Sequence, residues 1–307
     1  MKAIVFGGSG FLGSYVADEL SEQGYEVVIY DRQISPYLRK DQKMVVGDIL
    51  DREKVAGCVK GCDYAYSFAG IAGLADACRQ PVQTVETNIL GTTIVVDACR
   101  EYEVKRFVFA STIYVYSDLA PFYRSSKQAC ELIIEDYQKM YGLGFTILRY
   151  GSLYGRRANH FNYIYKIIQQ AVEGAKIVRK GDGEEIRSYI HVKDAAKSTV
   201  DILSEEFKNQ YVMVTGNQSI KVKELLNMIQ EIFHGEISVE YSGEAEAGHY
   251  EITPYAFRPK VAKKIVAGSY YDLGQGILDV IHEVYSKLNK NDKHISSIRK
   301  LLEPEQG

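Results

Sequence analysis

Short apolar segments alternate with helical patterns along the first half of the chain. Several of these segments are apolar after their first residue, which is typical of strands that are covered on both faces. The predicted strands are Lys2–Phe6, Glu26–Tyr30, Lys43–Val46, Tyr64–Phe68, Arg106–Ala110 and Phe145–Tyr150. The predicted helices between them are Phe11–Gln23, Asp51–Val59, Thr84–Tyr102 and Ser125–Tyr141. Such alternation predicts an α/β fold with a doubly wound parallel sheet and right-handed crossovers.

The alternation weakens after Tyr150. Further helices are predicted at Tyr163–Glu173, Lys193–Leu203, Val222–Phe233 and Gly276–Leu288. We therefore predict a first domain over residues 1–150, which a later segment near 186–215 rejoins, and a smaller α/β domain over most of 151–307. Ligands of open parallel sheets bind at the carboxyl ends of the strands, so the smaller domain is expected to pack at that edge.

Composition narrows the class of protein. The 307 residues fit one large domain or two ordinary ones, and 46% hydrophobic residues can form a full core. A net charge of −3 argues against nucleic-acid binding. No apolar run approaches the ~18 residues of a membrane span, and the apolar start is too short for a signal peptide. A cytoplasmic protein is therefore expected. The six histidines are scattered, so we expect no metal site.

A glycine-rich segment, Gly7–Gly13, follows the first predicted strand and opens the first helix. Glycine there permits a tight turn and close approach of the backbone to a pyrophosphate, and the helix N-terminus offers N–H groups to the phosphates. The motif alone is weak evidence, but its place between strand and helix is strong evidence for a dinucleotide site. We expect this site to use Gly7, Gly10, Phe11 and Leu12.

Asp31 ends the second predicted strand, and its carboxylate can accept hydrogen bonds from the adenosine ribose. A carboxylate would also repel a 2′-phosphate, which favours NAD over NADP as the cofactor. The neighbouring Arg32 favours NADP instead, because a guanidinium can accommodate that phosphate. A purely structural role for Asp31 at the strand end is the alternative interpretation.

Tyr123 and Lys127 are four residues apart, which places them on one face of a predicted helix. Such a pair can arise by chance in a chain with 24 tyrosines. Ser111 and Thr112 strengthen the case, because they end the fifth predicted strand and would point into the same crevice as the cofactor.

These motifs together resemble the extended short-chain dehydrogenases/reductases of the nucleotide-sugar epimerase/dehydratase group, with a Rossmann domain that binds NAD. The resemblance covers most of the chain. It rests on the glycine loop, Gly47–Ile49, Ala69–Gly70, Asn88–Thr92, Ser111–Thr112, Val115–Tyr116, Tyr123 and Lys127, Leu153–Gly155, Gly181–Gly183, Arg187 and His191–Asp194.

The resemblance also implies roles for single residues. Asp48 and Ile49 would contact adenine, Ala69 and Gly70 would line the cofactor groove, and Lys127 would bind the nicotinamide ribose. Structural alternatives remain for these positions, including a turn cap at Asp48, a helix-packing amide at Asn88 and a surface ion pair at Arg187. The implied substrate contacts are Thr112, Ser152, Arg187 and, as a weaker candidate, Arg258.

Oxidation of an alcohol requires a base for the hydroxyl proton as the hydride leaves carbon. Moving a phenol from its usual pKa of about 10 to neutrality takes roughly 4 kcal/mol, and a nearby ammonium acts in that direction. Tyr123 is the expected base and Thr112 the expected contact of the reacting hydroxyl. Related 4,6-dehydratases carry Asp-Glu after the threonine, whereas this chain has Ile113-Tyr114, which disfavours dehydration.

The sequence therefore predicts an NAD-dependent enzyme that acts on a nucleotide diphosphate sugar at C4. A 4-epimerase and a C4-dehydrogenase/reductase both remain open. The alternative is a non-catalytic NAD(H)-sensing regulatory protein on the same fold. Relatives commonly dimerise through two helices, and Thr84–Tyr102 and Ser125–Tyr141 carry more apolar positions than one core-facing stripe needs, which favours a homodimer.

Overall fold

The computed structural model describes residues 1–117, 119–217, 219–242, 263–265 and 270–287. They form two compact units, which are described separately below. Unit 1 contains residues 1–151 and 193–215 and the segment with strand β14, and unit 2 contains residues 152–192, 216–242 and 270–287. No helix among the described residues is long and apolar enough to cross a membrane.

Unit 1 is built on an eight-stranded sheet with the order β14-β11-β6-β5-β4-β1-β2-β3. Every strand pair in this sheet is parallel. The doubly wound parallel fold is therefore confirmed. The strands are β1 (Lys2–Phe6), β2 (Glu26–Asp31), β3 (Gln42–Val46), β4 (Tyr64–Ser67), β5 (Arg106–Thr112), β6 (Phe145–Tyr150), β11 (Gln210–Val214) and β14 (Lys263–Lys264).

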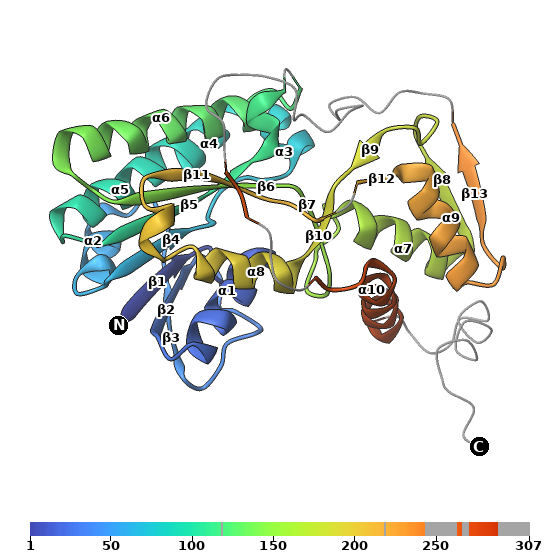
Figure 1. The fold of residues 1–307 in the computed structure, drawn as a ribbon, viewed down its shortest axis with the longest axis horizontal. Helices are drawn as coiled ribbons and strands as arrows, with labels where there is room; N and C mark the ends of the chain where they lie inside the picture. Colours follow the sequence, from blue (N-terminus) through green and yellow to red (C-terminus); the bar gives the residue numbers. More distant parts are fainter. Residues whose placement is uncertain (118, 218, 243–262, 266–269, 288–307) are drawn as a thin grey trace. The chain divides into compact units, whose positions relative to one another are not determined.

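Helices cover both faces of this sheet. Figure 1 shows α2, α5 and α6 on one face and α1 and α8 on the other. The helical elements of unit 1 are α1 (Phe11–Glu22), α2 (Arg52–Val59), α3 (Leu74–Arg79), α4 (Pro81–Thr84), the π-helix η1 (Val85–Leu90), α5 (Gly91–Glu101), the 3₁₀ turn η2 (Ile113–Tyr116), α6 (Tyr123–Tyr141), α8 (Val192–Asp201, which begins in unit 2) and η3 (Glu205–Phe207).

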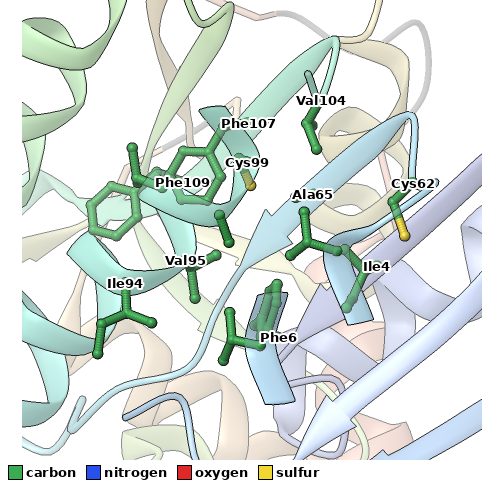
Figure 2. Close-up of a cluster of buried hydrophobic side chains, with 14 of the residues drawn as sticks. Ile4, Phe6, Cys62, Ala65, Ile94, Val95, Cys99, Val104, Phe107 and Phe109 are labelled. Carbon is green, nitrogen blue, oxygen red and sulfur yellow. The ribbon is translucent and has the colours of Figure 1, made fainter. Parts of the chain in front are cut away.

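The core of unit 1 follows from alternation along the strands. Ile4 and Phe6 of β1 point to the same face, and both are fully buried. They pack with Ala65 of β4, Phe107 of β5 and Val95 of α5 in one hydrophobic cluster (Figure 2). Because strands in the middle of the sheet are covered on both faces, their carboxyl ends are held rigidly where functional side chains can be placed.

Unit 2 is a smaller α/β unit with three small sheets, in which β7 pairs with β10, β9 with β12, and β8 with β13. Its core is a separate cluster formed largely by α7, α9 and α10. Its elements are β7 (Ser152–Tyr154), α7 (Tyr163–Gly174), β8 (Lys176–Arg179), β9 (Ile186–Arg187), β10 (Tyr189–His191), β12 (Ile220–Lys221), α9 (Val222–Ile232), β13 (Ser238–Tyr241) and α10 (Leu273–Lys287).

Candidate active site

The glycine loop lies between β1 and α1, as predicted. Gly7 adopts a left-handed conformation with φ +78, and its N–H donates to the Tyr30 carbonyl at 2.9 Å. A Cβ on Gly13 would lie 2.2 Å from the Gly7 carbonyl oxygen, so a side chain at Gly13 would force the loop open. Gly10 is the N-cap of α1 and offers no side-chain cap, which leaves the first N–H groups of the helix available to an anion.

Asp31 is joined to this loop by its carboxylate. One carboxylate oxygen accepts from the Ser9 N–H at 3.0 Å, and the other accepts from the Gln33 N–H at 3.2 Å. The Ser9 hydroxyl in turn donates to the Gln33 carbonyl at 2.8 Å. Each carboxylate oxygen keeps capacity for another donor, so Asp31 is oriented at the loop and can still accept from ribose hydroxyls.

Asp48 and Ile49 follow β3. The Asp48 carboxylate accepts from the Leu50 N–H at 3.0 Å, and the Asp48 carbonyl accepts from the buried Tyr30 hydroxyl at 2.8 Å. Ile49 is 6% exposed and contacts Gly91 so closely that a Cβ there would lie 2.4 Å from its Cδ1. The hydrogen bonds of Asp48 and the apolar packing of Ile49 thus hold this segment beside the end of β3.

Ala69 and Gly70 follow β4, and the next residue, Ile71, is held by Asn88. The buried Asn88 amide accepts from the Ile71 N–H at 2.7 Å and donates to the Ile71 carbonyl at 3.1 Å and to the Ser126 hydroxyl at 2.9 Å. Asn88 therefore joins the segment after β4 to helix α6. It lies in the π-helix η1, a type of element that is often found at functional sites.

Thr112, Tyr123 and Lys127 meet at the carboxyl end of β5. Thr112 is the last residue of β5, Tyr123 is the first residue of α6, and their hydroxyls form a hydrogen bond. Lys127 lies one turn further along α6, with its Nζ 5.9 Å from the centre of the Tyr123 ring. The Lys127 Nζ donates to the Ala110 carbonyl at 2.8 Å and lies 4.7 Å from the Phe109 ring centre.

Burial changes the acidity of two of these groups. It raises the pKa of Tyr123 to about 12, while the hydrogen bond with Thr112 acts to lower it. Burial also lowers the pKa of Lys127, and the nearby Cys130 and Glu131 oppose that shift. The phenol thus needs more help to ionise than a free phenol does, and the adjacent amine loses its proton more easily than a free lysine.

The expected substrate contacts other than Thr112 lie elsewhere in the chain. Ser152 begins β7, and its N–H donates to the Ser188 carbonyl at 3.1 Å. Arg187 ends β9, pairs with Ile220 across the β9–β12 ladder and is 6% exposed, so it is buried rather than part of a surface ion pair. Arg258 lies outside the described residues.

Comparison with protein families is decisive for the class of protein. Residues 3–214 match the model of the NAD dependent epimerase/dehydratase family. The chain belongs to this family. The matched segment contains the glycine loop and every candidate site residue named above except Arg258, and it ends with β11. The expectation of an NAD-dependent enzyme is thereby confirmed.

Relatives of this family member have several activities. A UDP-N-acetyl-alpha-D-glucosaminuronate decarboxylase of Bacillus cytotoxicus is 27% identical and is aligned over 76% of this chain and 80% of its own. A UDP-glucose 4-epimerase of Rhizobium meliloti is also 27% identical, over 79% and 85%. A solved UDP-glucuronic acid 4-epimerase of Bacillus cereus, in complex with UDP-glucuronic acid and NAD, has the same fold, with a TM-score of 0.80, 21% identity and coverage of 93% and 99%.

The residues that the structure brings together fit an NAD site of this family. The uncapped start of α1, the Gly7–Gly13 turn and the Asp31 carboxylate occupy adjoining positions at the ends of β1 and β2. The structural alternative for Asn88, a helix-packing amide, agrees with its hydrogen bond to Ser126 of α6. Its two bonds to Ile71 were not predicted, because they join segments that are distant in sequence. The signal available was the single amide side chain within the predicted helix Thr84–Tyr102.

Proposed function

We propose that the chain transfers a hydride between NAD and C4 of a nucleotide diphosphate sugar, giving a 4-keto species. The meeting of Thr112, Tyr123 and Lys127 at the end of β5 is the observation that carries this proposal. A 4-epimerase and a C4-dehydrogenase/reductase both need only these groups together with the nicotinamide. They differ in whether the keto sugar is turned over in the site or released.

Tyr123 is the proposed general base in oxidation and the general acid in reduction. Starting from a pKa of about 12, ionisation near neutrality requires roughly 7 kcal/mol of preferential stabilisation of the phenolate. Thr112 supplies part of it through the hydrogen bond between the two hydroxyls. The same hydroxyl is suited to hold the reacting sugar hydroxyl beside the phenol.

Lys127 is proposed to supply, as a cation, a further part of the stabilisation of the Tyr123 phenolate. It is also proposed to bind the nicotinamide ribose. Its hydrogen bond to the Ala110 carbonyl and its place over the Phe109 ring stabilise the ammonium form against the effect of burial. When bound, NAD supplies the hydride acceptor and adds a positive charge of the same sign as Lys127. The remaining proposed NAD contacts are Gly7, Gly10, Phe11, Leu12, Asp31, Asp48, Ile49, Ala69 and Gly70.

The residues after Thr112 support redox chemistry at C4 without elimination of water. Ile113 is 3% exposed and has no acid–base group. The ring of Tyr114 packs edge-on against that of Tyr123, with 6.5 Å between the ring centres. Neither residue can act as the carboxylate pair of a 4,6-dehydratase, so we propose a product that keeps its C6 hydroxyl.

Ser152, Arg187 and Arg258 are proposed to bind the substrate, with Arg187 at its diphosphate. A guanidinium suits this role because its fork of N–H donors matches phosphate oxygens. Substitution of Arg187 by lysine would keep the charge but lose that fork. The expected result is a higher KM for the nucleotide sugar with little change in kcat.

The central test is Tyr123→Phe, which removes the proposed base and keeps the ring. Turnover should fall by roughly four orders of magnitude or more, while the affinity for NADH in a fluorescence titration stays within about threefold of wild type. Tyr66→Phe is the matched control, because it removes a fully buried phenol hydroxyl from β4 of the same sheet. Near-normal turnover of Tyr123→Phe would refute the assignment.

A panel of nucleotide sugars separates the two outcomes at C4. Each sugar is incubated with the protein and NAD, NADH is followed by absorbance, and the sugar is analysed by mass spectrometry and NMR. A C4 epimer without accumulation of NADH identifies an epimerase, whereas stoichiometric NADH with a keto sugar identifies a dehydrogenase. A product lighter by one water would identify a dehydratase and contradict the proposal.

We also propose that the chain forms a homodimer through the exposed faces of α6 and of the helical run from α4 to α5. The apolar positions in excess of one stripe are Ile89, Ile94, Val95, Leu132, Ile133 and Ile134. Three of these six, Ile94, Val95 and Ile134, are buried within unit 1. Leu132 is 60% exposed on α6, and Met140 is 73% exposed on the same helix. Apolar side chains that stay exposed in one copy support contact with a second.

A further inference from the structure

Three buried side chains beneath the proposed catalytic residues form one hydrogen-bonded cluster. Ser111 of β5 and Arg149 of β6 are paired residues of adjacent strands. The Glu131 carboxylate, from helix α6, accepts from the Ser111 hydroxyl at 2.6 Å and from two nitrogens of Arg149 at 3.0 and 2.6 Å. All three are less than 7% exposed. We call these residues the Glu131 cluster.

The Glu131 cluster is adjacent to two of the proposed catalytic residues, Thr112 and Lys127. Ser111 directly precedes Thr112, and Glu131 lies one helical turn after Lys127. Helix α6 is therefore tied to the end of β5 at two successive turns, by the Lys127–Ala110 and Glu131–Ser111 hydrogen bonds. A shift of α6 along the strand would break both bonds and would move Tyr123 away from Thr112.

The charged groups of the Glu131 cluster also influence Lys127 on helix α6. Arg149 and Lys127 are both buried cations, and the Glu131 carboxylate interacts with each of them. Among the described residues, Lys127 also faces Tyr123 and Cys130 on its own helix and the Phe109 ring and the Ala110 carbonyl of β5. Removing the Glu131 charge would leave two buried cations without the anion that opposes deprotonation of Lys127.

We propose that Glu131 is a positioning residue, which sets the register of Tyr123 and Lys127 against Thr112 through its bonds to Ser111 and Arg149. The proposal rests on the proposed function for what these residues do, but the contacts that carry it are independent of the substrate. Glu131 does not touch the reacting atoms. Its effect is on the geometry and charge state of residues that do.

Three variants separate this role from ordinary structural stabilisation. Ser111→Ala breaks one bond of the cluster and leaves the Arg149–Glu131 ion pair in place, so it should fold. Glu131→Gln removes the charge and keeps the shape. Glu135→Gln is the matched control, because Glu135 is equally buried one turn further along α6, where its carboxylate accepts from Tyr211 instead.

Ser111→Ala should lower kcat roughly 10- to 100-fold with little change in KM, because small displacements of reacting groups have effects of that size. Glu131→Gln should lower kcat similarly and shift the high-pH limb of the rate profile, where Lys127 loses its proton, to lower pH. Glu135→Gln should keep the kcat and the pH profile of wild type. A wild-type kcat for Ser111→Ala together with an unshifted profile for Glu131→Gln would overturn the proposal.

Titration with NADH distinguishes failure of this proposal from failure of the proposed function. If the wild type turns over none of the nucleotide sugars, the proposed function fails, and the positioning role is judged from NADH affinity alone. Glu131→Gln should then bind NADH about tenfold more weakly than Glu135→Gln, because Lys127 is displaced or neutral. Equal affinities of these two variants would reject the role of Glu131.

Discussion

Replacement of Lys127 by methionine removes the ammonium that faces Tyr123 and keeps a side chain of similar length. The Lys127 Nζ lies 5.9 Å from the centre of the Tyr123 ring, over which a phenolate charge is delocalised. At an effective dielectric constant of about 20, unit charges at that distance attract each other by roughly 3 kcal/mol. That energy corresponds to about two pKa units of the phenol.

The assay is the pH dependence of kcat for oxidation at saturating NAD. For Lys127→Met, the limb that reports ionisation of Tyr123 should move about two units to higher pH. On the lower-pH side of that limb, the rate should fall about 100-fold. Lys127→Arg keeps the charge and should leave the limb near its wild-type position, with any loss confined to geometry. If the limb of Lys127→Met coincides with that of wild type, the electrostatic explanation is refuted.

Three further substitutions test the glycine loop, an ion pair of unit 1 and the proposed dimer. Gly13→Ala should weaken NADH binding at least about tenfold, because its Cβ would lie 2.2 Å from the Gly7 carbonyl oxygen. In a urea titration, the same variant should lower the free energy of unfolding by about 1–3 kcal/mol. The control is Gly57→Ala in α2, where a Cβ meets nothing, and it should leave the free energy of unfolding unchanged or raise it. Lys105 holds the pKa of Asp63 below its usual value of 3.8, so this carboxylate stabilises the fold at neutral pH and the effect is lost as the pH falls through the lowered value. The melting temperature of Asp63→Asn should be lower than that of wild type at pH 7, and the difference should shrink as the pH is lowered below 3.8. Leu132→Glu should give the mass of a monomer in light scattering, whereas Val178→Glu, at an exposed position of β8 in unit 2, should keep the dimer mass.

The fold of unit 1 could be predicted because most of its strands are largely apolar runs separated by helical patterns. Strand β11 was not predicted, since Gln210–Val214 is a short run in a region where that alternation has weakened. Strand β14 consists of two exposed lysines, and only its backbone pairing with β11 makes it a strand. The helix predicted from Thr84 begins earlier, at Pro81, and contains a π-helix that propensity alone does not indicate.

In the site too, residues in local sequence motifs could be predicted, whereas contacts between distant segments could not. The glycine loop and the Tyr123–Lys127 spacing are local patterns, and the structure places their residues where those patterns predict. The Asn88 contacts and the Glu131 cluster join segments that are far apart in the sequence. A single sequence contains no signal for such pairings, since each partner alone resembles an ordinary polar residue of a helix or strand.

The ribosome releases β11 and β14, at one side of the large sheet, only after the six strands beside them. Until residues 210–214 emerge, the backbone N–H and C=O groups along the outer edge of β6 have no strand to pair with. Unpaired edges recruit other chains, and parallel sheets assembled from distant segments fold slowly. Nascent chains therefore pass through an interval in which aggregation competes with folding. A translation product that stops between Tyr150 and Gln210 would retain the unpaired edge of β6 and would depend on chaperones to stay in solution.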